Sequence, residues 1–318
     1  MRFEGSLPAI CLGAGALAVA LLVSVEASSQ EPMAPPTVSA ASVFVLDATT
    51  GKPLYRKNEH KQARLHSLTK LATAAVLVEQ MGDRLTETVT ITPKHLTTGA
   101  SAGLRKGDVW TLSDLLAGML LVSGNDAANA IADAAGRAML SAEGKKGDPI
   151  KRFVKAMNET AVSLGAKSAR FADPSGLSPE NVASAEDMAA IGATVFRDPR
   201  LLPYWRCKAR TLSIRGPAAR EVPLKSTVEV LEEDRVIGAK TGSHLGNKIF
   251  NLAGAWRAPN GDTIVIVNFG SANNEARYDD FRAIVAALPS DHPELASPIP
   301  AGTMTAAACP EQPGKPAP

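Results

Sequence analysis

Strand-like segments lie near both ends of this chain, and helical patterns occupy the region between them. Residues 42–56 have the pattern of two strands around a turn, and residues 249–269 have the same pattern around Pro259-Asn260-Gly261-Asp262. Strands so far apart in the sequence bury their apolar faces by joining a single sheet. The sequence therefore predicts an α/β (α+β) fold, in which an antiparallel sheet is flanked by helices and a helical second lobe is inserted.

Apolar spacing and capping residues predict the helices. Residues 71–81 are almost uniformly apolar and end at Gly82, which is typical of a helix buried on all sides. Thr111-Leu112-Ser113-Asp114 resembles a capping box and predicts a helix as far as about residue 121. Apolar periodicity predicts four further helices, over residues 126–135, 150–164 and 185–196 and around residues 276–288.

Both ends of the chain differ in composition from its body. An uncharged run followed by Val25-Glu26-Ala27 predicts that residues 1–27 are a signal peptide, with an uncleaved anchor as the alternative. Residues 28–40 contain three prolines and are expected to form a linker to a folded domain over residues 41–288. Eight prolines in residues 289–318 predict a disordered tail. Both a cleaved signal peptide and an uncleaved anchor would place the domain outside the cytoplasm, in the periplasm or beyond. Any association with the membrane is expected through the N-terminus alone.

Composition argues against several classes of function. The net charge is +2, so no nucleic acid is expected as a partner. The five histidines show no metal-ligand spacing, and neither a metal nor another cofactor is expected. Outside the N-terminal segment, Cys207 and Cys309 are too few for a disulfide scaffold. Two unrelated thiols are expected, with a disulfide in an oxidising compartment as the alternative.

The motif Ser67-Leu68-Thr69-Lys70 lies where a loop meets the apolar helix. Lys70 returns to the face of Ser67 about one turn later. A serine hydroxyl becomes a good nucleophile when another group takes its proton, and lysine can do so when burial or nearby cations favour its neutral form. Taken alone, the tetrapeptide is better explained as a helix start with a solvated lysine.

A second motif, Ser123-Gly124-Asn125, lies between two predicted helices. The Ser123 hydroxyl could relay a proton between Lys70 and a leaving amine. The Asn125 amide could hold both the substrate backbone and the lysine. Taken alone, the motif is better explained as the C-cap of one helix and the N-cap of the next.

A third motif, Lys240-Thr241-Gly242, ends an apolar strand. Lys240 and Thr241 could hold the carboxylate of a substrate, and Gly242 would let an extended peptide approach closely. The alternative is an edge strand whose lysine guards against aggregation.

The three motifs occur once each, in an order that is the signature of serine β-lactamases and penicillin-binding proteins. Over residues 41–288 the chain resembles the D-alanyl-D-alanine carboxypeptidases among the low-molecular-mass penicillin-binding proteins. Further segments that resemble the family are Thr98-Gly99-Ala100-Ser101 and residues 115–128, 157–158, 164–165 and 171–177.

The resemblance implies roles for the motif residues. Ser67 would be the nucleophile that forms an acyl ester, and Lys70 its general base. Ser123 and Asn125 would relay protons and hold substrate, and Lys240 with Thr241 would recognise a carboxylate.

The resemblance also implies an oxyanion hole made by the N–H groups of Ser67 and Ser243. Arg277 would bind the terminal carboxylate of the substrate, whereas a surface pair with Asp279 or Asp280 is the alternative. Two departures from the family pattern affect the site: His66 replaces a small residue before the nucleophile, and residues 243–248 lack a common threonine.

The implied function is removal of the terminal D-alanine from peptidoglycan stem peptides ending in D-Ala-D-Ala, with β-lactam antibiotics as covalent inhibitors. A D,D-endopeptidase of peptidoglycan crosslinks would carry the same motifs. A class A β-lactamase would need a glutamate for deacylation, and Glu180 is the candidate. A non-catalytic wall-binding protein should have lost part of the constellation, which is complete here.

Overall fold

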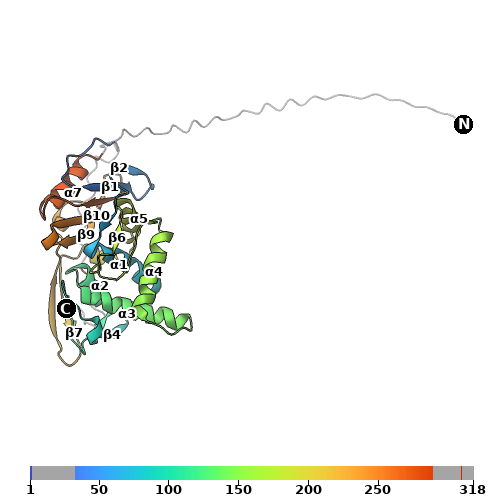
Figure 1. Ribbon diagram of the computed structural model, residues 1–318, viewed down its shortest axis with the longest axis vertical. Helices are drawn as coiled ribbons and strands as arrows, with labels where there is room; N and C mark the ends of the chain where they lie inside the picture. Colours follow the sequence, from blue (N-terminus) through green and yellow to red (C-terminus); the bar gives the residue numbers. More distant parts are fainter. Residues whose placement is uncertain (2–32, 289–308, 310–318) are drawn as a thin grey trace. The chain divides into compact units, whose positions relative to one another are not determined.

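The computed structural model describes residues 33–288 together with Met1 and Cys309 (Figure 1). Apart from Met1, the predicted signal segment lies outside these residues, and so does the predicted tail apart from Cys309. The helices and strands among the described residues all belong to one unit, Pro32–Pro318. Among the described residues, no helix combines the length and hydropathy needed to cross a membrane.

A five-stranded antiparallel sheet is built from both ends of the domain, as predicted. Its order is β2-β1-β11-β10-β9, and β1 pairs with β11 so that Ser42 lies opposite Phe269. The strands are β1 (Ser42–Asp47), β2 (Pro53–Lys57), β9 (Val236–His244), β10 (Ile249–Arg257) and β11 (Thr263–Phe269). β9 is therefore an edge strand, next to β10 on one side.

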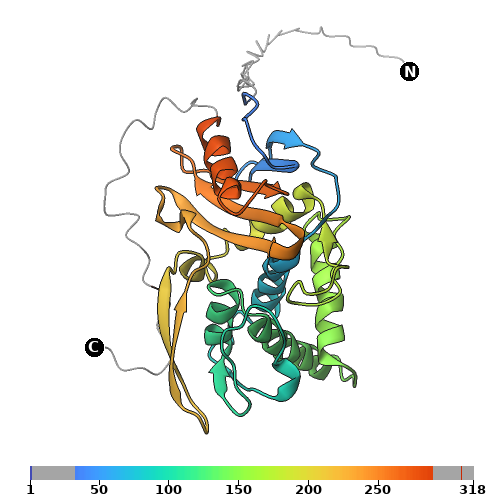
Figure 2. The same ribbon diagram turned by 60° about the vertical axis from the view of Figure 1, so that its left-hand side comes forward.

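Alternation along the strands gives the sheet two buried faces. Phe44, Val265 and Val267 belong to the same core as α1 (Thr69–Met81) and α5 (Ala185–Val195). The intervening residues, such as Val45 and Ile266, pack in a second core with Phe281 and Ile284 of α7 (Ala276–Ala286). Helices consequently cover both faces (Figure 2).

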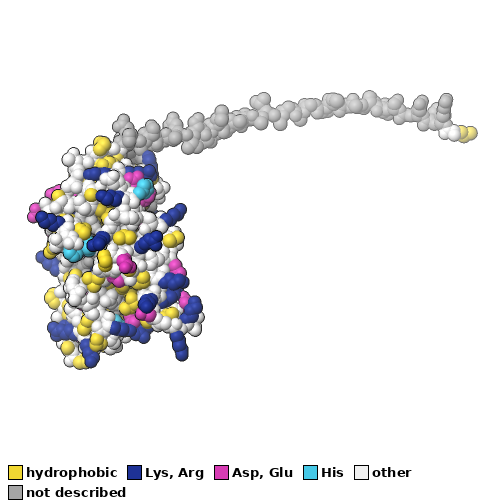
Figure 3. Space-filling view, viewed as in Figure 1, with side chains coloured by type: hydrophobic (Ala, Val, Ile, Leu, Met, Phe, Trp, Pro, Cys, Tyr) yellow, Lys and Arg dark blue, Asp and Glu magenta, His cyan; other side chains and the backbone are white. Residues whose placement is uncertain are grey.

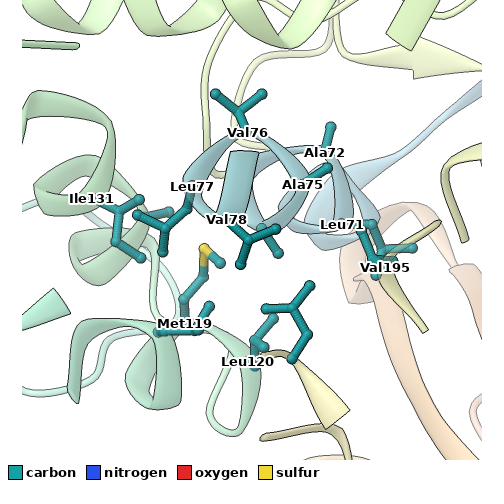
Figure 4. Close-up of a cluster of buried hydrophobic side chains, with 14 of the residues drawn as sticks. Leu71, Ala72, Ala75, Val76, Leu77, Val78, Met119, Leu120, Ile131 and Val195 are labelled. Atoms are coloured by element: carbon teal, nitrogen blue, oxygen red, sulfur yellow. The ribbon is translucent and has the colours of Figure 1, made fainter. Parts of the chain in front are cut away.

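Helix α1 lies at the centre of the first core. Because its sequence is apolar on all sides, it packs against several helices at once. Figure 4 shows Leu77 and Val78 near Met119 and Leu120, and Leu71 near Val195. The other large helices of this lobe are α2 (Leu112–Leu120), α3 (Asn125–Ala142) and α4 (Pro149–Ser163). The predicted helices are confirmed, including the cap in which Thr111 Oγ1 accepts the Asp114 N–H at 3.0 Å.

Several short elements were not predicted. The longest are β7 (Ala209–Ile214) and β8 (Arg220–Lys225), which form a separate hairpin beside the helical lobe (Figure 2). Apart from 3-10 turns, the rest are β3 (Ala63–Arg64), β4 (Thr88–Thr90), β5 (Val109–Thr111), β6 (Val182–Ala183) and α6 (Leu202–Trp205).

The expectation of two unrelated thiols is wrong. Cys207 and Cys309 form a disulfide with their Cα atoms 4.8 Å apart, 102 residues apart in sequence. The bond places Cys309, from the predicted tail, beside the first residue of β7, where its Sγ lies 3.1 Å from the Ala209 carbonyl oxygen. The two thiols lie too far apart in the chain for sequence spacing to reveal the pairing.

The surface of the domain is mixed in charge. On the face shown in Figure 3, cationic side chains are scattered among anionic, apolar and neutral ones. Such a surface carries no concentrated basic stripe of the kind that tracks a nucleic-acid backbone on that face.

Candidate active site

Ser67 and Lys70 meet at the start of α1. Ser67 lies in the 3-10 turn His66–Leu68, and Lys70 follows in the first turn of the helix. The Lys70 Nζ donates to Ser67 Oγ at 3.1 Å, to Asn125 Oδ1 at 2.8 Å and to the Ser175 carbonyl oxygen at 2.7 Å. The lysine side chain is 0% exposed, so the solvated lysine of the alternative interpretation is wrong.

The surroundings of Lys70 favour its neutral amine. Burial first, and then the nearby cation of Lys240, bring the pKa of Lys70 well below its ordinary value. Asp173 and Asp126 act in the opposite direction and weaken this shift. A neutral amine 3.1 Å from the Ser67 hydroxyl can accept its proton.

The Ser175 carbonyl is held in place by a carboxylate. Asp173 accepts hydrogen bonds from the backbone N–H groups of Ser175 at 2.6 Å, Gly176 at 2.8 Å and Ser178 at 2.6 Å. Thr73 of α1 also donates to the Pro174 carbonyl at 2.6 Å. The Asp-Pro-Ser-Gly sequence is typical of such a side-chain-capped turn, but sequence analysis could not place its carbonyl group beside Lys70.

Asn125 connects the lysine to the segment that begins at Thr98. Its Oδ1 accepts from Lys70, its Nδ2 donates to the Thr98 carbonyl at 2.9 Å, and its N–H donates to the Ala100 carbonyl at 2.8 Å. The next residue, Asp126, accepts from the Ala102 N–H at 2.9 Å. The amide therefore holds the lysine as predicted, and both of its side-chain atoms already have partners.

Ser123 is paired with Lys240 across the site. The Lys240 Nζ donates to Ser123 Oγ at 3.0 Å and to the carbonyl of Thr241 at 3.1 Å. Ser123 has a φ of +61°, an uncommon conformation for a serine, and it aims the side chain at β9. Burial, followed by repulsion from Arg277, lowers the pKa of Lys240 to about 7. Among the described residues, no hydrogen bond joins Ser123 directly to Lys70.

The close approach predicted at Gly242 has a different partner from the one expected. A Cβ on Gly242 would collide with the Leu65 carbonyl oxygen and lie 3.0 Å from Leu68 Cγ. The backbone that needs this space is therefore the chain's own turn around Ser67. Gly242 thus lets the edge strand pack directly against the turn that carries Ser67.

Arg277 is buried beside the end of β9. It is 4% exposed, and it donates to Ser243 Oγ at 2.6 Å and to Asn274 Oδ1 at 2.5 Å. Its guanidinium also lies over the Tyr278 ring, 4.9 Å from the centroid. The alternative of a surface pair with Asp279 or Asp280 is wrong for this side chain, since these acids bond to Arg282 and Ser39.

The candidate for a β-lactamase glutamate lies away from the lysine. Glu180 is exposed, and its N–H donates to the hydroxyl of Ser178 in its own loop. In the part of the chain that the structure describes, no group of three or more His, Cys, Asp or Glu side chains is arranged to hold a metal ion.

Known proteins are similar to this chain in sequence and in fold. The sequence profile of the D-alanyl-D-alanine carboxypeptidase family matches residues 28–267. The chain belongs to this family. A D-alanyl-D-alanine carboxypeptidase of Streptomyces sp. strain K15 is 28% identical over 79% of this chain and 87% of its own length. The crystal structure of the Streptomyces K15 DD-transpeptidase has a TM-score of 0.72 at 26% identity, covering 80% of this chain and 98% of that one.

A relative whose name states a different activity also matches. The D-alanyl-D-alanine endopeptidase of Pseudomonas aeruginosa is 30% identical over 57% of this chain. The chain spans about half, 55%, of that relative's length. The predicted family and fold class are confirmed, and the comparisons support the predicted enzyme class.

Proposed function

We propose that this protein is a serine-type D-alanyl-D-alanine carboxypeptidase that removes the terminal D-alanine of peptidoglycan stem peptides. The observation that carries the proposal is the buried Lys70 amine, 3.1 Å from Ser67 Oγ and held by Asn125 and the Ser175 carbonyl. Burial and repulsion from Lys240 keep the pKa of Lys70 low, as a general base requires.

In the first half of the reaction, Ser67 Oγ attacks the carbonyl carbon of the penultimate D-alanine while Lys70 takes the hydroxyl proton. The N–H groups of Ser67 and Ser243 would stabilise the oxyanion that forms. The C–N bond then breaks, and the leaving amine takes a proton that Ser123 delivers. Lys240, with a pKa of about 7 and a 3.0 Å bond to Ser123, is suited to replace that proton.

Before the second half, the proton that Lys70 took from Ser67 passes to Lys240, which lost one to the leaving amine through Ser123, so that Lys70 is neutral again. Water then attacks the acyl ester and Lys70 takes a proton of this water. Lys70 returns that proton to Ser67 Oγ as the C–O bond to Ser67 breaks. The products are the shortened peptide and the free serine. No acidic side chain is assigned to this step, because Glu180 is exposed and Asp173 is engaged by backbone N–H groups.

The terminal carboxylate would be recognised by hydroxyl groups backed by cations. Lys240 is fully buried behind Ser123 and Thr241, so its charge acts over a distance. Ser243 is exposed and accepts a hydrogen bond from Arg277, which leaves its own proton free for a carboxylate oxygen. Thr241, Ser243 and Arg277 therefore form the proposed carboxylate site, which a carboxypeptidase needs and an endopeptidase does not.

The experiment that tests this function is incubation with fluorescent penicillin, followed by mass spectrometry of the labelled peptide. We expect a covalent adduct on Ser67, since β-lactams would acylate the same serine. A D,D-endopeptidase is the second candidate, because relatives carry that activity in their names. Release of D-alanine from a peptide ending in D-Ala-D-Ala, compared with cleavage of a crosslinked peptide, separates the two.

We also propose that the chain is exported and works outside the cytoplasm, where peptidoglycan lies.

A further inference from the structure

Two histidine rings pack against each other beside the proposed nucleophile. His66 directly precedes Ser67 on the 3-10 turn, and His244, the last residue of β9, directly follows Ser243. The ring centroids are 5.3 Å apart, with an interplanar angle of 46°. The N–H groups of Ser67 and Ser243 are the two that we assign to the oxyanion hole. Each of them therefore lies next to a residue whose ring takes part in this contact.

The backbone around this pair is closely packed. A Cβ on Gly176 would lie 3.0 Å from the Ser67 nitrogen, so this glycine keeps the space beside one proposed donor open. His66 has a φ of +48°, a left-handed conformation in which histidine is found more often than most residues. The turn is thus pressed against a loop on one side and against β9 at Gly242 on the other. The contact between the two rings joins the turn to the end of β9.

The environment of His66 favours a neutral ring. Its Nε2 atom is shielded from solvent and has no hydrogen-bond partner among the residues that the structure describes. A proton on this atom would create a buried cationic N–H group without an acceptor. Burial first, and then His244 and Arg64, lower the pKa of His66.

Ionisable groups on the neighbouring elements do not offset this effect. Lys70 of α1 and Lys240 of β9 carry no negative charge, and their hydrogen bonds run to other groups. Asp173, on the loop before Gly176, is engaged by backbone N–H groups of that loop. Within residues 33–288, no carboxylate is hydrogen-bonded to either ring, and His244 Nδ1 accepts from a backbone N–H group at 3.0 Å.

We propose that His66 and His244 are positioning residues, whose ring contact holds the Ser67 and Ser243 N–H groups at the separation that the tetrahedral intermediate requires while the His66 ring is neutral. This inference rests on the proposed function. Protonation of His66 adds a buried cationic N–H group without an acceptor beside the cation of Arg64, and pushes the turn away from β9. Acylation then slows, because one oxyanion donor is misplaced.

The test is the pH dependence of acylation by benzylpenicillin, measured as a single-turnover rate constant. His66→Phe and His244→Phe keep an aromatic ring in place but cannot take a proton. We expect the wild-type rate constant to fall roughly threefold or more between about pH 7.5 and pH 5.5. In each variant the ratio of the rate constant at about pH 7.5 to that at about pH 5.5 should lie closer to one than in the wild type. In the wild type, the dissociation constant of the non-covalent penicillin complex should change less with pH than the acylation rate constant does.

His60→Phe is the matched control. His60 is 72% exposed and pairs with Glu186 at 2.9 Å, so its replacement should leave the wild-type ratio unchanged. Lys70 and Lys240 titrate in every variant, and comparison of ratios cancels their contribution.

Wild-type ratios in both phenylalanine variants would overturn the inference. If His66→Phe fails to fold, His244→Phe decides alone, because His244 lies at the exposed end of β9. Absence of covalent labelling at every pH in the wild-type protein would instead contradict the proposed function.

Discussion

The candidate active site joins a group of buried residues to a group that runs from buried residues to exposed ones. The helical wall comprises the start of α1, the Ser123–Asn125 loop and the loop around Ser175, and its Lys70 is 0% exposed with three hydrogen bonds. The strand wall comprises the end of β9 with Arg277. It continues into exposed residues, of which Leu245 is 78% exposed.

This difference separates chemistry from recognition. Proton transfer requires groups held at hydrogen-bond distance in a dry environment, which the helical wall supplies. An edge strand with an accessible end can pair with an extended peptide and adapt to the residues on the leaving side of the reacting bond. We therefore expect changes in the helical wall to affect reaction with every substrate, and changes in the strand wall to affect some substrates more than others.

The largest effect is expected from Ser67→Ala in the helical wall. Loss of one hydroxyl group should abolish covalent labelling by penicillin and release of D-alanine alike, because the acyl bond cannot form. Gel fluorescence with labelled penicillin and a thermal unfolding curve give the result and its folding control. Labelling of the mutant would show that another residue is the nucleophile.

Lys70→Arg should reduce acylation by a factor on the order of 10² or more. Arginine carries a positive charge and does not deprotonate at working pH, so it cannot take the proton of Ser67. Pre-steady-state labelling with and without this substitution provides the measurement. A rate close to that of the wild type would assign the base to another group and remove the main argument for the helical wall.

Arg277→Ala tests the strand wall. The charged hydrogen bond that reaches the substrate through Ser243 is worth about 1.5–3 kcal/mol, so we expect a tenfold to hundredfold loss of kcat/KM for D-alanine release. Cleavage of a bond followed by further residues should lose much less, since no carboxylate lies at that position. An unchanged ratio of the two efficiencies would contradict the recognition role and favour the endopeptidase.

The smallest effect concerns stability. Burial alone would raise the pKa of Asp173, but the hydrogen bonds from Ser175, Ser178 and Gly176 together lower it. A depressed pKa in the folded state stabilises the protein above the unfolded-state pKa, and this stabilisation is lost as pH falls through the folded-state value.

Asp173→Asn should therefore lower the free energy of unfolding by about 1–3 kcal/mol at neutral pH and by less in acid. Ser243→Ala, in the strand wall, should change it by less than about 1 kcal/mol. Urea unfolding at two pH values measures both. An equal loss in the two variants would remove the contrast between the walls.

Local patterns predicted the parts of the fold that local forces determine. The apolar run of α1 and the Thr111 cap need only neighbours in the sequence, and both were found. The β7–β8 hairpin was missed because Pro223 interrupts the strand pattern of β8. The order of the three motifs, with the family resemblance, predicted the residues around Ser67, although each motif alone favoured a simpler explanation.

Contacts between segments that are distant in the chain could not be predicted from the sequence. The Ser175 carbonyl that accepts from Lys70 is a backbone group, and every residue has one, so the residue type could not predict this contact. The partner of Gly242 is the Leu65–Leu68 turn, and the partner of Cys207 is 102 residues away. In each case the tertiary structure supplies the second half of the interaction.

The pairing of β1 with β11 has a consequence for how the chain acquires its structure. The N-terminal segment leaves the ribosome first. β1 therefore has no β11 to pair with until residue 269 has emerged. During that interval the edge of the β1–β2 hairpin that will meet β11 is open to other chains, including copies of this one. Synthesis through residue 269 thus sets the earliest moment at which the central sheet can close, and truncation before β11 would leave the first hairpin without the sheet that it completes.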